Sequence, residues 1–144
     1  MNEPAICQAL KHWEEGSWDQ ELADRIFSSL RRSGVGVDGA LERFLGDEPL
    51  YLHSLLRFSQ DPQLQKLKRL LDERAFQDAF EVIHLLKGST ATLNLTPINV
   101  PLSLVTEYLR YGEDPGVDKL KAFWDSYEAF CQLLEKELEG KKQA

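Results

Sequence analysis

Three residues near the middle of the chain, His84, Lys87 and Gly88, combine a nucleophile, a positive charge and a missing side chain. Residues three and four positions apart are neighbours on one helix face. A neutral imidazole can attack phosphorus and hold a phosphoryl group on a ring nitrogen. An ammonium one turn away would offset the charge of that group, and glycine would let another protein approach closely. The triplet therefore predicts a phospho-accepting histidine that is open to a partner.

The helix that must carry this histidine is predicted over residues 75–93. At about 100° per residue, one broad arc forms its core face, which comprises Ala75, Phe76, Ala79, Phe80, Val82, Ile83, Leu86, Thr90 and Leu93. His84 falls on the other side, together with Gln77, Glu81, Gly88 and Ala91. Leu85 lies outside the arc, and we expect it to meet a neighbouring helix. A glycine inside a helix costs about 0.5–1 kcal/mol relative to alanine, so its presence beside His84 calls for a reason.

Helical patterns extend over almost the whole chain, and no convincing strand pattern interrupts them. Apolar spacing and helix-stop residues predict helices over 19–32, 37–45, 47–58, 63–73, 97–111 and 117–138, besides the helix over 75–93. Asp47 is placed to cap the third of these helices, and Pro62 suits the first turn of the fourth. Successive amphipathic helices with short connections predict an antiparallel helical bundle.

Composition narrows the classes of partner. The chain has 144 residues, which suits one domain, and its net charge of −7 argues against nucleic acid. No apolar stretch approaches the roughly 18 residues of a membrane span. With no recognisable export signal and only two cysteines, we expect a reduced, cytoplasmic protein. Three scattered histidines without nearby cysteine or carboxylate ligands predict no metal site.

The segment "HLLKGST", His84 to Thr90, resembles the signature of histidine-containing phosphotransfer (HPt) domains. The preceding "GVDGALERFLGDEPLYLHSLLRF", residues 36–58, and the later Glu107 with "YLRYGE" are similar to flanking segments of that family. The resemblance covers about residues 35–138. It implies an all-α fold, an antiparallel four-helix bundle of HPt type with one or more additional N-terminal helices. Residues 1–34 would then be an N-terminal extension, and residues 139–144 a polar tail.

The resemblance also implies roles for particular residues. His84 would be the phospho-acceptor, Lys87 its charge partner and Gly88 the clearance position. A rim that a receiver domain touches would comprise Gln77, Phe80, Glu81 and Ala91. The partners would be response-regulator receiver domains and possibly a hybrid histidine kinase. The protein would be a phosphocarrier without kinase activity or cofactor of its own, because the receiver supplies the magnesium.

Two departures from the family pattern leave an alternative open. Ile83 stands where the family usually has a small residue, and Asn94 stands where a glycine is usual near the helix end. A non-phosphorylated adaptor that binds a receiver or kinase is therefore the main rival, since a fold does not secure a function. The phosphotransfer domain of a chemotaxis kinase fits less well, and an unrelated helical enzyme ranks last. "GVGVDG", Gly34 to Gly39, matches a dinucleotide fingerprint, but it lacks the βαβ context and is interpreted as a helix stop and turn.

Overall fold

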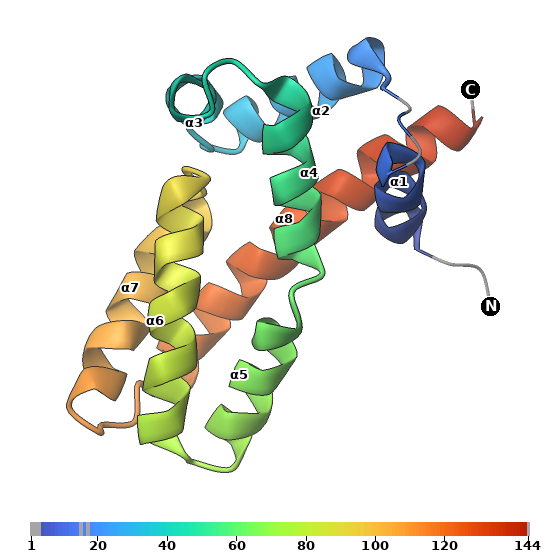
Figure 1. Ribbon diagram of the computed structural model, residues 1–144. Helices are drawn as coiled ribbons and strands as arrows, with labels where there is room; N and C mark the ends of the chain where they lie inside the picture. Colours follow the sequence, from blue (N-terminus) through green and yellow to red (C-terminus); the bar gives the residue numbers. More distant parts are fainter. Residues whose placement is uncertain (1–3, 15, 17, 144) are drawn as a thin grey trace.

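Figure 1 shows a computed structural model of the chain, which describes residues 4–14, 16 and 18–143. These residues form helices and their connections, with no strand among them, so the all-α prediction is confirmed. In chain order the helices are α1 (Ala5–Glu14), α2 (Gln20–Arg32), α3 (Val37–Arg43), α4 (Glu48–Ser59), α5 (Pro62–Asp72), α6 (Phe76–Thr92), α7 (Thr96–Arg110) and α8 (Val117–Gln143).

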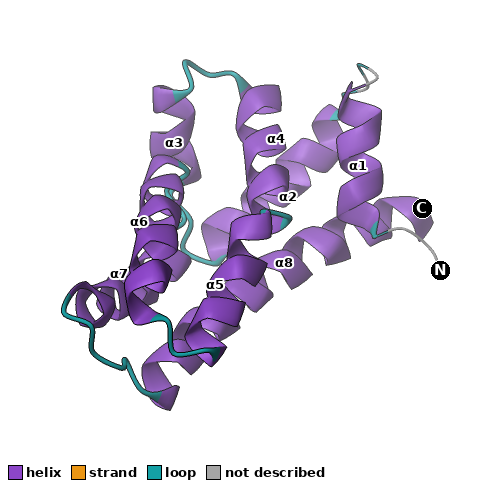
Figure 2. Cartoon of the chain, turned by 60° about the horizontal axis from the view of Figure 1, so that its bottom comes forward, coloured by secondary structure: helices purple, strands orange, loops and turns teal. Residues whose placement is uncertain are grey.

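Helices α5, α6, α7 and α8 pack on one another in chain order (Figures 1 and 2). The direction of α7 against α6 follows from two contacts at opposite ends. Asn99, early in α7, donates a hydrogen bond to the carbonyl of Lys87, late in α6. Arg110, the last residue of α7, lies over the ring of Phe80, near the start of α6. The two helices are therefore antiparallel, and α7 runs alongside the segment that carries His84.

Helix α8 contacts both the middle and the ends of the chain. It has 27 residues, which corresponds to a length of about 40 Å. Near its start the Lys119 ammonium lies over the Tyr108 ring of α7, 4.8 Å from the centroid. In its second half the Glu135 carboxylate accepts hydrogen bonds from the first two backbone N–H groups of α1, both at 3.2 Å. Further along, the Glu137 carboxylate accepts one from Ser29 of α2.

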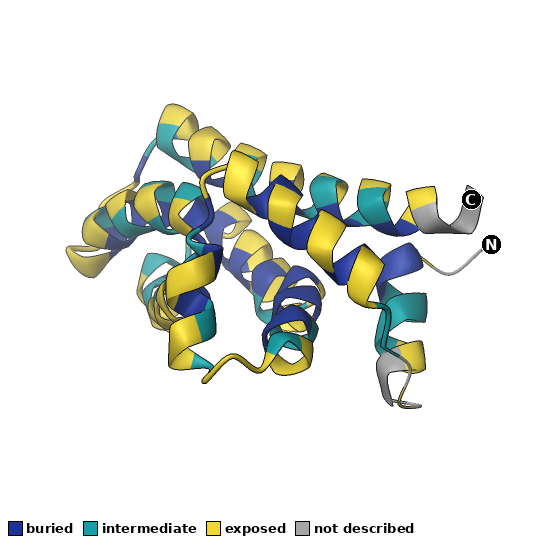
Figure 3. Cartoon of the chain, turned by 90° about the horizontal axis from the view of Figure 1, so that it is seen from above, coloured by how far each residue is buried: buried dark blue, intermediate teal, exposed yellow. Residues whose placement is uncertain are grey.

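The buried apolar side chains form one cluster that includes residues of the first two helices. Ile6 of α1 and Leu30 of α2 are buried in it, as are Leu134 and Leu138 of α8 (Figure 3). The predicted extension over residues 1–34 thus folds, within its described part, onto the second half of α8. Residues 1–3, 15 and 17 of that segment, and residue 144 of the predicted tail, lie outside the described residues.

The helix predicted over residues 117–138 is longer than expected, because α8 continues from Leu138 to Gln143 through the polar segment at the end of the chain. Nothing in this segment breaks a helix: glutamate, lysine and glutamine are good helix formers, and the single glycine, Gly140, has only a weak cost. Leu138 is the last buried apolar residue among those whose burial is described, and the helix extends beyond it.

Aspartate side chains begin three of the helices. The carboxylates of Asp19, Asp47 and Asp61 accept hydrogen bonds from backbone N–H groups in the first turns of α2, α4 and α5. These bonds satisfy donors that a helix leaves free at its N-terminus, and a negative charge there is also favoured by the helix dipole. The predicted cap at Asp47 and the predicted place of Pro62, the first residue of α5, are confirmed.

Asn94 ends the histidine-bearing helix in a left-handed backbone conformation, with φ of 55°. The N–H of Leu95 bonds to the carbonyl of Thr90, and that of Asn94 to Ala91, which closes the helix in the manner usual for glycine. The Asn94 side chain also donates to the carbonyl of Gly36, whose own N–H bonds back to the Asn94 carbonyl, each at 3.0 Å. An asparagine in the usual glycine position thus adds a contact that glycine lacks.

This contact explains the "GVGVDG" segment. A side chain added at Gly36 or at Gly39 would place its Cβ 3.1 or 3.0 Å from the amide nitrogen of Asn94. The two glycines therefore give the Asn94 side chain room to reach the start of α3. The interpretation as a helix stop and turn holds for the first half of the segment, where Gly34 follows α2 with φ of 100°, whereas Val37 to Gly39 already belong to α3.

Replacing Asn94 with alanine is expected to lower the free energy of unfolding by about 1.5–3 kcal/mol, since both the side-chain hydrogen bond and tolerance of left-handed backbone are lost. Asn94→Gly keeps the backbone freedom and loses only the bond, so about 1 kcal/mol is expected for it. Urea unfolding followed by circular dichroism measures both. If both variants lost the same free energy of unfolding, the left-handed backbone conformation at position 94 would make no contribution to the difference between alanine and asparagine.

Two tyrosine hydroxyls are held inside the fold. Tyr51 donates to the carbonyl of Leu93 at 2.9 Å, and Tyr127 donates to the carbonyl of Ser59 at 2.6 Å. Burial, which disfavours the charged phenolate, raises the pKa of both above the ordinary value of 10.0. Folding therefore favours the protonated form of both side chains.

We expect the free energy of unfolding to fall as the pH rises above about 10, by up to about 1.4 kcal/mol per pH unit from Tyr51. The unfolded chain loses the phenol proton there while the folded chain keeps it, so alkaline pH favours unfolding. Urea unfolding between pH 8 and pH 11.5 measures the slope. Tyr51→Phe should flatten it, whereas Tyr111→Phe, at an exposed tyrosine, should leave it unchanged.

Within the described residues, no helix combines the length and the apolar character that crossing a membrane requires.

Candidate functional site

His84 is exposed on the outer face of α6. The inner face buries Ala79, Val82, Ile83, Leu86 and Thr90, which were all placed on the core arc. Of the remaining arc residues, Leu93 is buried, and Ala75, Phe76 and Phe80 are partly buried. The expected exposure of His84, Gln77, Glu81, Gly88 and Ala91 is confirmed. The imidazole is therefore available to a molecule approaching from solvent.

An aromatic ring lies on the N-terminal side of the histidine. The rings of Phe80 and His84 have their centroids 5.8 Å apart and are tilted by 32°. The guanidinium of Arg110 on α7 lies over the ring of Phe80, 5.5 Å from its centroid. The same guanidinium donates a hydrogen bond to the Glu107 carboxylate at 3.2 Å. Phe80 restricts the space open to the imidazole, and the charge of the Arg110 guanidinium over that ring is compensated by Glu107.

Lys87 is anchored through its backbone. Its carbonyl accepts the Thr90 hydroxyl at 3.0 Å and the Asn99 amide of α7 at 3.3 Å. Asn99 also donates to the Thr90 hydroxyl at 2.9 Å, so α7 holds the turn of α6 that follows His84. The Lys87 ammonium has no ion-pair or hydrogen-bond partner among the residues described. It is thus a free positive charge one turn from the imidazole.

Gly88 opens the surface on the C-terminal side of the histidine. It is exposed, and a Cβ built there would meet no heavy atom within 4 Å outside its own helix. Close packing inside the protein therefore does not require glycine at this position. Ala91, three residues later on the same face, is also small and exposed. A partner could approach the helix closely along this strip.

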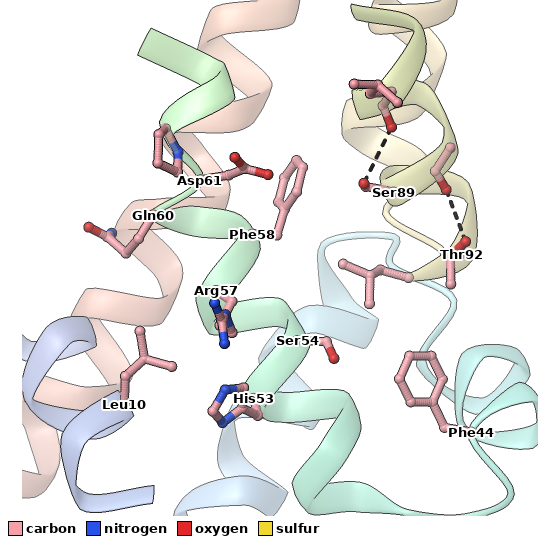
Figure 4. Close-up of a pocket in the computed structure, with 14 residues that line it drawn as sticks. Leu10, Phe44, His53, Ser54, Arg57, Phe58, Gln60, Asp61, Ser89 and Thr92 are labelled. Carbon is pink, nitrogen blue, oxygen red and sulfur yellow. Dashed lines mark hydrogen bonds between the residues drawn. The ribbon is translucent and has the colours of Figure 1, made fainter. Parts of the chain in front are cut away.

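A groove of about 890 Å³ lies beside this strip, between α4 and α6 (Figure 4). The α6 wall consists of Leu85, Gly88, Ser89 and Thr92. The facing wall and ends are formed by residues of α1, the α3–α4 turn, α4 and the start of α5: Leu10, Phe44, His53, Ser54, Arg57, Phe58, Gln60, Asp61 and Pro62. Because Gly88 belongs to both features, the groove and the exposed histidine face are continuous.

The polar groups of the groove have capacity left for a partner. The Ser89 and Thr92 hydroxyls donate to the carbonyls of Leu85 and Gly88 on their own helix, which leaves their oxygens able to accept (Figure 4). Arg57 is exposed and has no ion-pair partner among the described side chains. The groove therefore combines apolar walls with hydroxyl acceptors and one free guanidinium.

The expectation for Leu85 is wrong: its side chain is 63% exposed and contacts no neighbouring helix closely enough to be covered. The residue lies on the side of α6 that faces α4, but the groove separates the two helices. Its position outside the core arc was the one sequence signal for this exposure. His53, Ser54 and Arg57 gave no comparable signal, since only the arrangement of α4 opposite α6 brings them to this surface.

Groups of three or more histidine, cysteine or carboxylate side chains arranged to hold a metal ion are absent from the residues that the structure describes. Comparisons with protein-family models, curated proteins and solved structures found no match. The exposed imidazole of His84, the Lys87 ammonium and the open position at Gly88 are therefore the observations from which a function can be inferred.

Proposed function

We propose that this protein is a histidine phosphotransfer protein that carries a phosphoryl group on His84 between receiver-domain aspartates in a two-component phosphorelay. The observation that carries the proposal is the exposed imidazole of His84 beside the free ammonium of Lys87 and the open position at Gly88. The packing of α5, α6, α7 and α8 in chain order, with α6 and α7 antiparallel, is compatible with a four-helix bundle of HPt type. A phosphorelay of this kind would operate in the cytoplasm.

The proposed reaction is a transfer between two proteins. A neutral ring nitrogen of His84 attacks the phosphorus of a phospho-aspartate, a nitrogen–phosphorus bond forms, and the aspartate–phosphorus bond breaks to release the carboxylate. By resemblance to the family, the outer ring nitrogen is the nucleophile. Lys87 offsets the negative charge of the phosphoryl group, whereas Arg110 is already paired with Glu107. The receiver supplies magnesium, so this chain needs no cofactor or ATP site.

The docking surface is proposed to extend beyond the rim expected from sequence. Gln77, Phe80, Glu81 and Ala91 would form its part on α6. The groove beside Gly88 would add Leu85 and the facing wall of α4. A receiver that covers both would exclude water from the imidazole, which strengthens the electrostatic contribution of the Lys87 ammonium.

The test is transfer of radiolabelled phosphate from a panel of phosphorylated receiver domains, run beside binding measurements on the same receivers. We expect at least one receiver to bind and to pass its label to the protein. The label should be lost in acid and retained in base, as a phosphorus–nitrogen bond requires. A label stable in acid, or attached to another residue by mass spectrometry, would contradict the proposal.

The groove supports the adaptor as the second candidate, because it offers a binding surface that does not depend on histidine chemistry. An adaptor would bind a receiver or kinase through the groove and take up no phosphate. Receivers that bind with full affinity and never transfer label would therefore select this function over phosphotransfer.

A further inference from the structure

The only two cysteines of the chain both lie beside the end of α4, although they are far apart in sequence. Cys7 belongs to the first turns of α1, and Cys131 belongs to α8; both are free thiols and partly buried. The Cys7 sulfur lies 3.8 Å from the side-chain oxygen of Gln60, and the Cys131 sulfur lies 3.9 Å from the carbonyl oxygen of Ser59. Both thiols thus contact consecutive residues at the end of α4.

A second set of contacts holds the same two segments together. The backbone N–H groups of Ala5 and Ile6 donate to the carboxylate of Glu135, each at 3.2 Å. Glu135 lies one turn after Cys131 on α8, and Ala5 and Ile6 directly precede Cys7. The start of α1 is therefore fixed against the turn of α8 that carries the second cysteine, in agreement with the crossing of these helices in Figure 1.

We propose that Cys7 and Cys131 form a reversible intramolecular disulfide on exposure to hydrogen peroxide, which fastens α1 to α8. Each thiol points to an oxygen acceptor in the reduced protein, so both side chains must change rotamer before the sulfurs can meet. A disulfide needs Cα atoms about 4.4–6.8 Å apart, so the proposal includes a movement of α1 on α8 to whatever extent that separation requires. The proposal does not depend on phosphotransfer at His84.

The oxidation balances in two steps. Peroxide oxygen adds to the Cys7 sulfur, which becomes a sulfenic acid while peroxide is reduced to water. The Cys131 sulfur then attacks the Cys7 sulfur, the sulfur–sulfur bond forms, and the sulfur–oxygen bond breaks. The departing hydroxide takes the Cys131 proton and leaves as a second water. Burial raises the pKa of the Cys131 thiol, which disfavours its thiolate and suits this residue to the second step rather than the first.

The bond would alter the groove beside the histidine. Leu10, which lies one turn after Cys7 on α1, lines that groove. A disulfide at Cys7 would hold this wall in place, whereas in the reduced protein α1 is kept there by non-covalent contacts. It would also close most of the chain into one loop, the arrangement in which a cross-link restricts the unfolded state most. Intracellular disulfides of this type are usually transient and redox-sensing.

The test treats the reduced, full-length protein with dilute hydrogen peroxide. We expect titratable thiols to fall from two to none, the protein to stay monomeric on a non-reducing gel, and its mass to drop by two hydrogens. Peptide mass spectrometry should find Cys7 joined to Cys131, and dithiothreitol should restore both thiols. The oxidised form should melt higher by about 5 °C or more.

Cys7→Ser and Cys131→Ser are the matched controls, and neither should show the mass change or the rise in melting temperature. Persistence of both thiols, oxidation of each sulfur to sulfinic acid, or cross-linking between two molecules would overturn the proposal. None of these measurements uses a receiver domain. A negative result for the disulfide therefore does not affect the phosphotransfer proposal, and a negative result for phosphotransfer does not affect the disulfide proposal.

Discussion

His84→Gln is expected to abolish phosphoryl uptake, by at least about 10³-fold, while leaving the fold and receiver binding intact. An amide cannot replace the nucleophilic ring nitrogen, and removal of a nucleophile costs several orders of magnitude in rate. The side chain is exposed, so glutamine fits without disturbing the core, and we expect the free energy of unfolding to change by less than about 0.5 kcal/mol. The measurement is label transfer from the receiver that phosphorylates the wild-type protein.

His12→Gln is the matched control, because His12 is also an exposed histidine on a helix, at the far end of the chain. It should take up phosphate at the wild-type rate. Receiver affinity of His84→Gln should stay within about fivefold of wild type, as expected for one exposed contact. Uptake that survives in His84→Gln would place the phosphoryl group elsewhere and refute the proposed role of this histidine.

Gly88→Gln is expected to stabilise the protein and at the same time to lower phosphoryl uptake by about a hundredfold or more. A residue with better helix propensity replaces a mid-helix glycine, which should raise the free energy of unfolding by up to about 0.5–1 kcal/mol. A Cβ at this position would meet no heavy atom within 4 Å outside its own helix, so the new side chain can start outward from α6 without a clash. It would, however, project between the imidazole and an incoming receiver, and a displacement of about 1 Å can cost 10²-fold in rate.

Gly140→Gln separates the two effects. Gly140 is likewise an exposed helical glycine with open space around it, so its replacement should also stabilise, without reaching His84. Urea unfolding and label transfer are measured on both variants, with Gly88→Ala as an intermediate size. Normal uptake by Gly88→Gln would mean that partners do not approach across this position.

The positions that sequence predicted well are those where local chemistry decides the structure. Asp47 caps α4 because a carboxylate beside free N–H groups is favoured whatever the rest of the chain does. Asn94 accepts a left-handed backbone for a similarly local reason. The exposed place of His84 followed from the helical period alone, since six of the nine expected core positions of α6 are buried and so fix its orientation.

The features that escaped prediction depend on how helices meet. The groove exists because the chain breaks between α4 and α5, before Pro62. Of these two helices, α5 packs closely on α6 and α4 does not. A sequence signals that break, but it does not state the angle that the two helices adopt. The exposure of Leu85 is a consequence of the same angle. The link between Asn94 and Gly36 joins positions 58 residues apart, and no local pattern announces it.

The contacts that α8 makes with α1 and α2 determine which residues a truncated version of this protein must include. A fragment of residues 35–138, chosen from the family resemblance, would retain His84 but remove Ile6, Leu22 and Ile26, which are buried in the shared core. The second half of α8 would then present a bare apolar flank to water and invite self-association. A fusion, graft or isotope-labelled piece designed around the histidine therefore has to begin at α1. The unit that folds together therefore includes α1 and α2, which lie outside the segment that resembles the family.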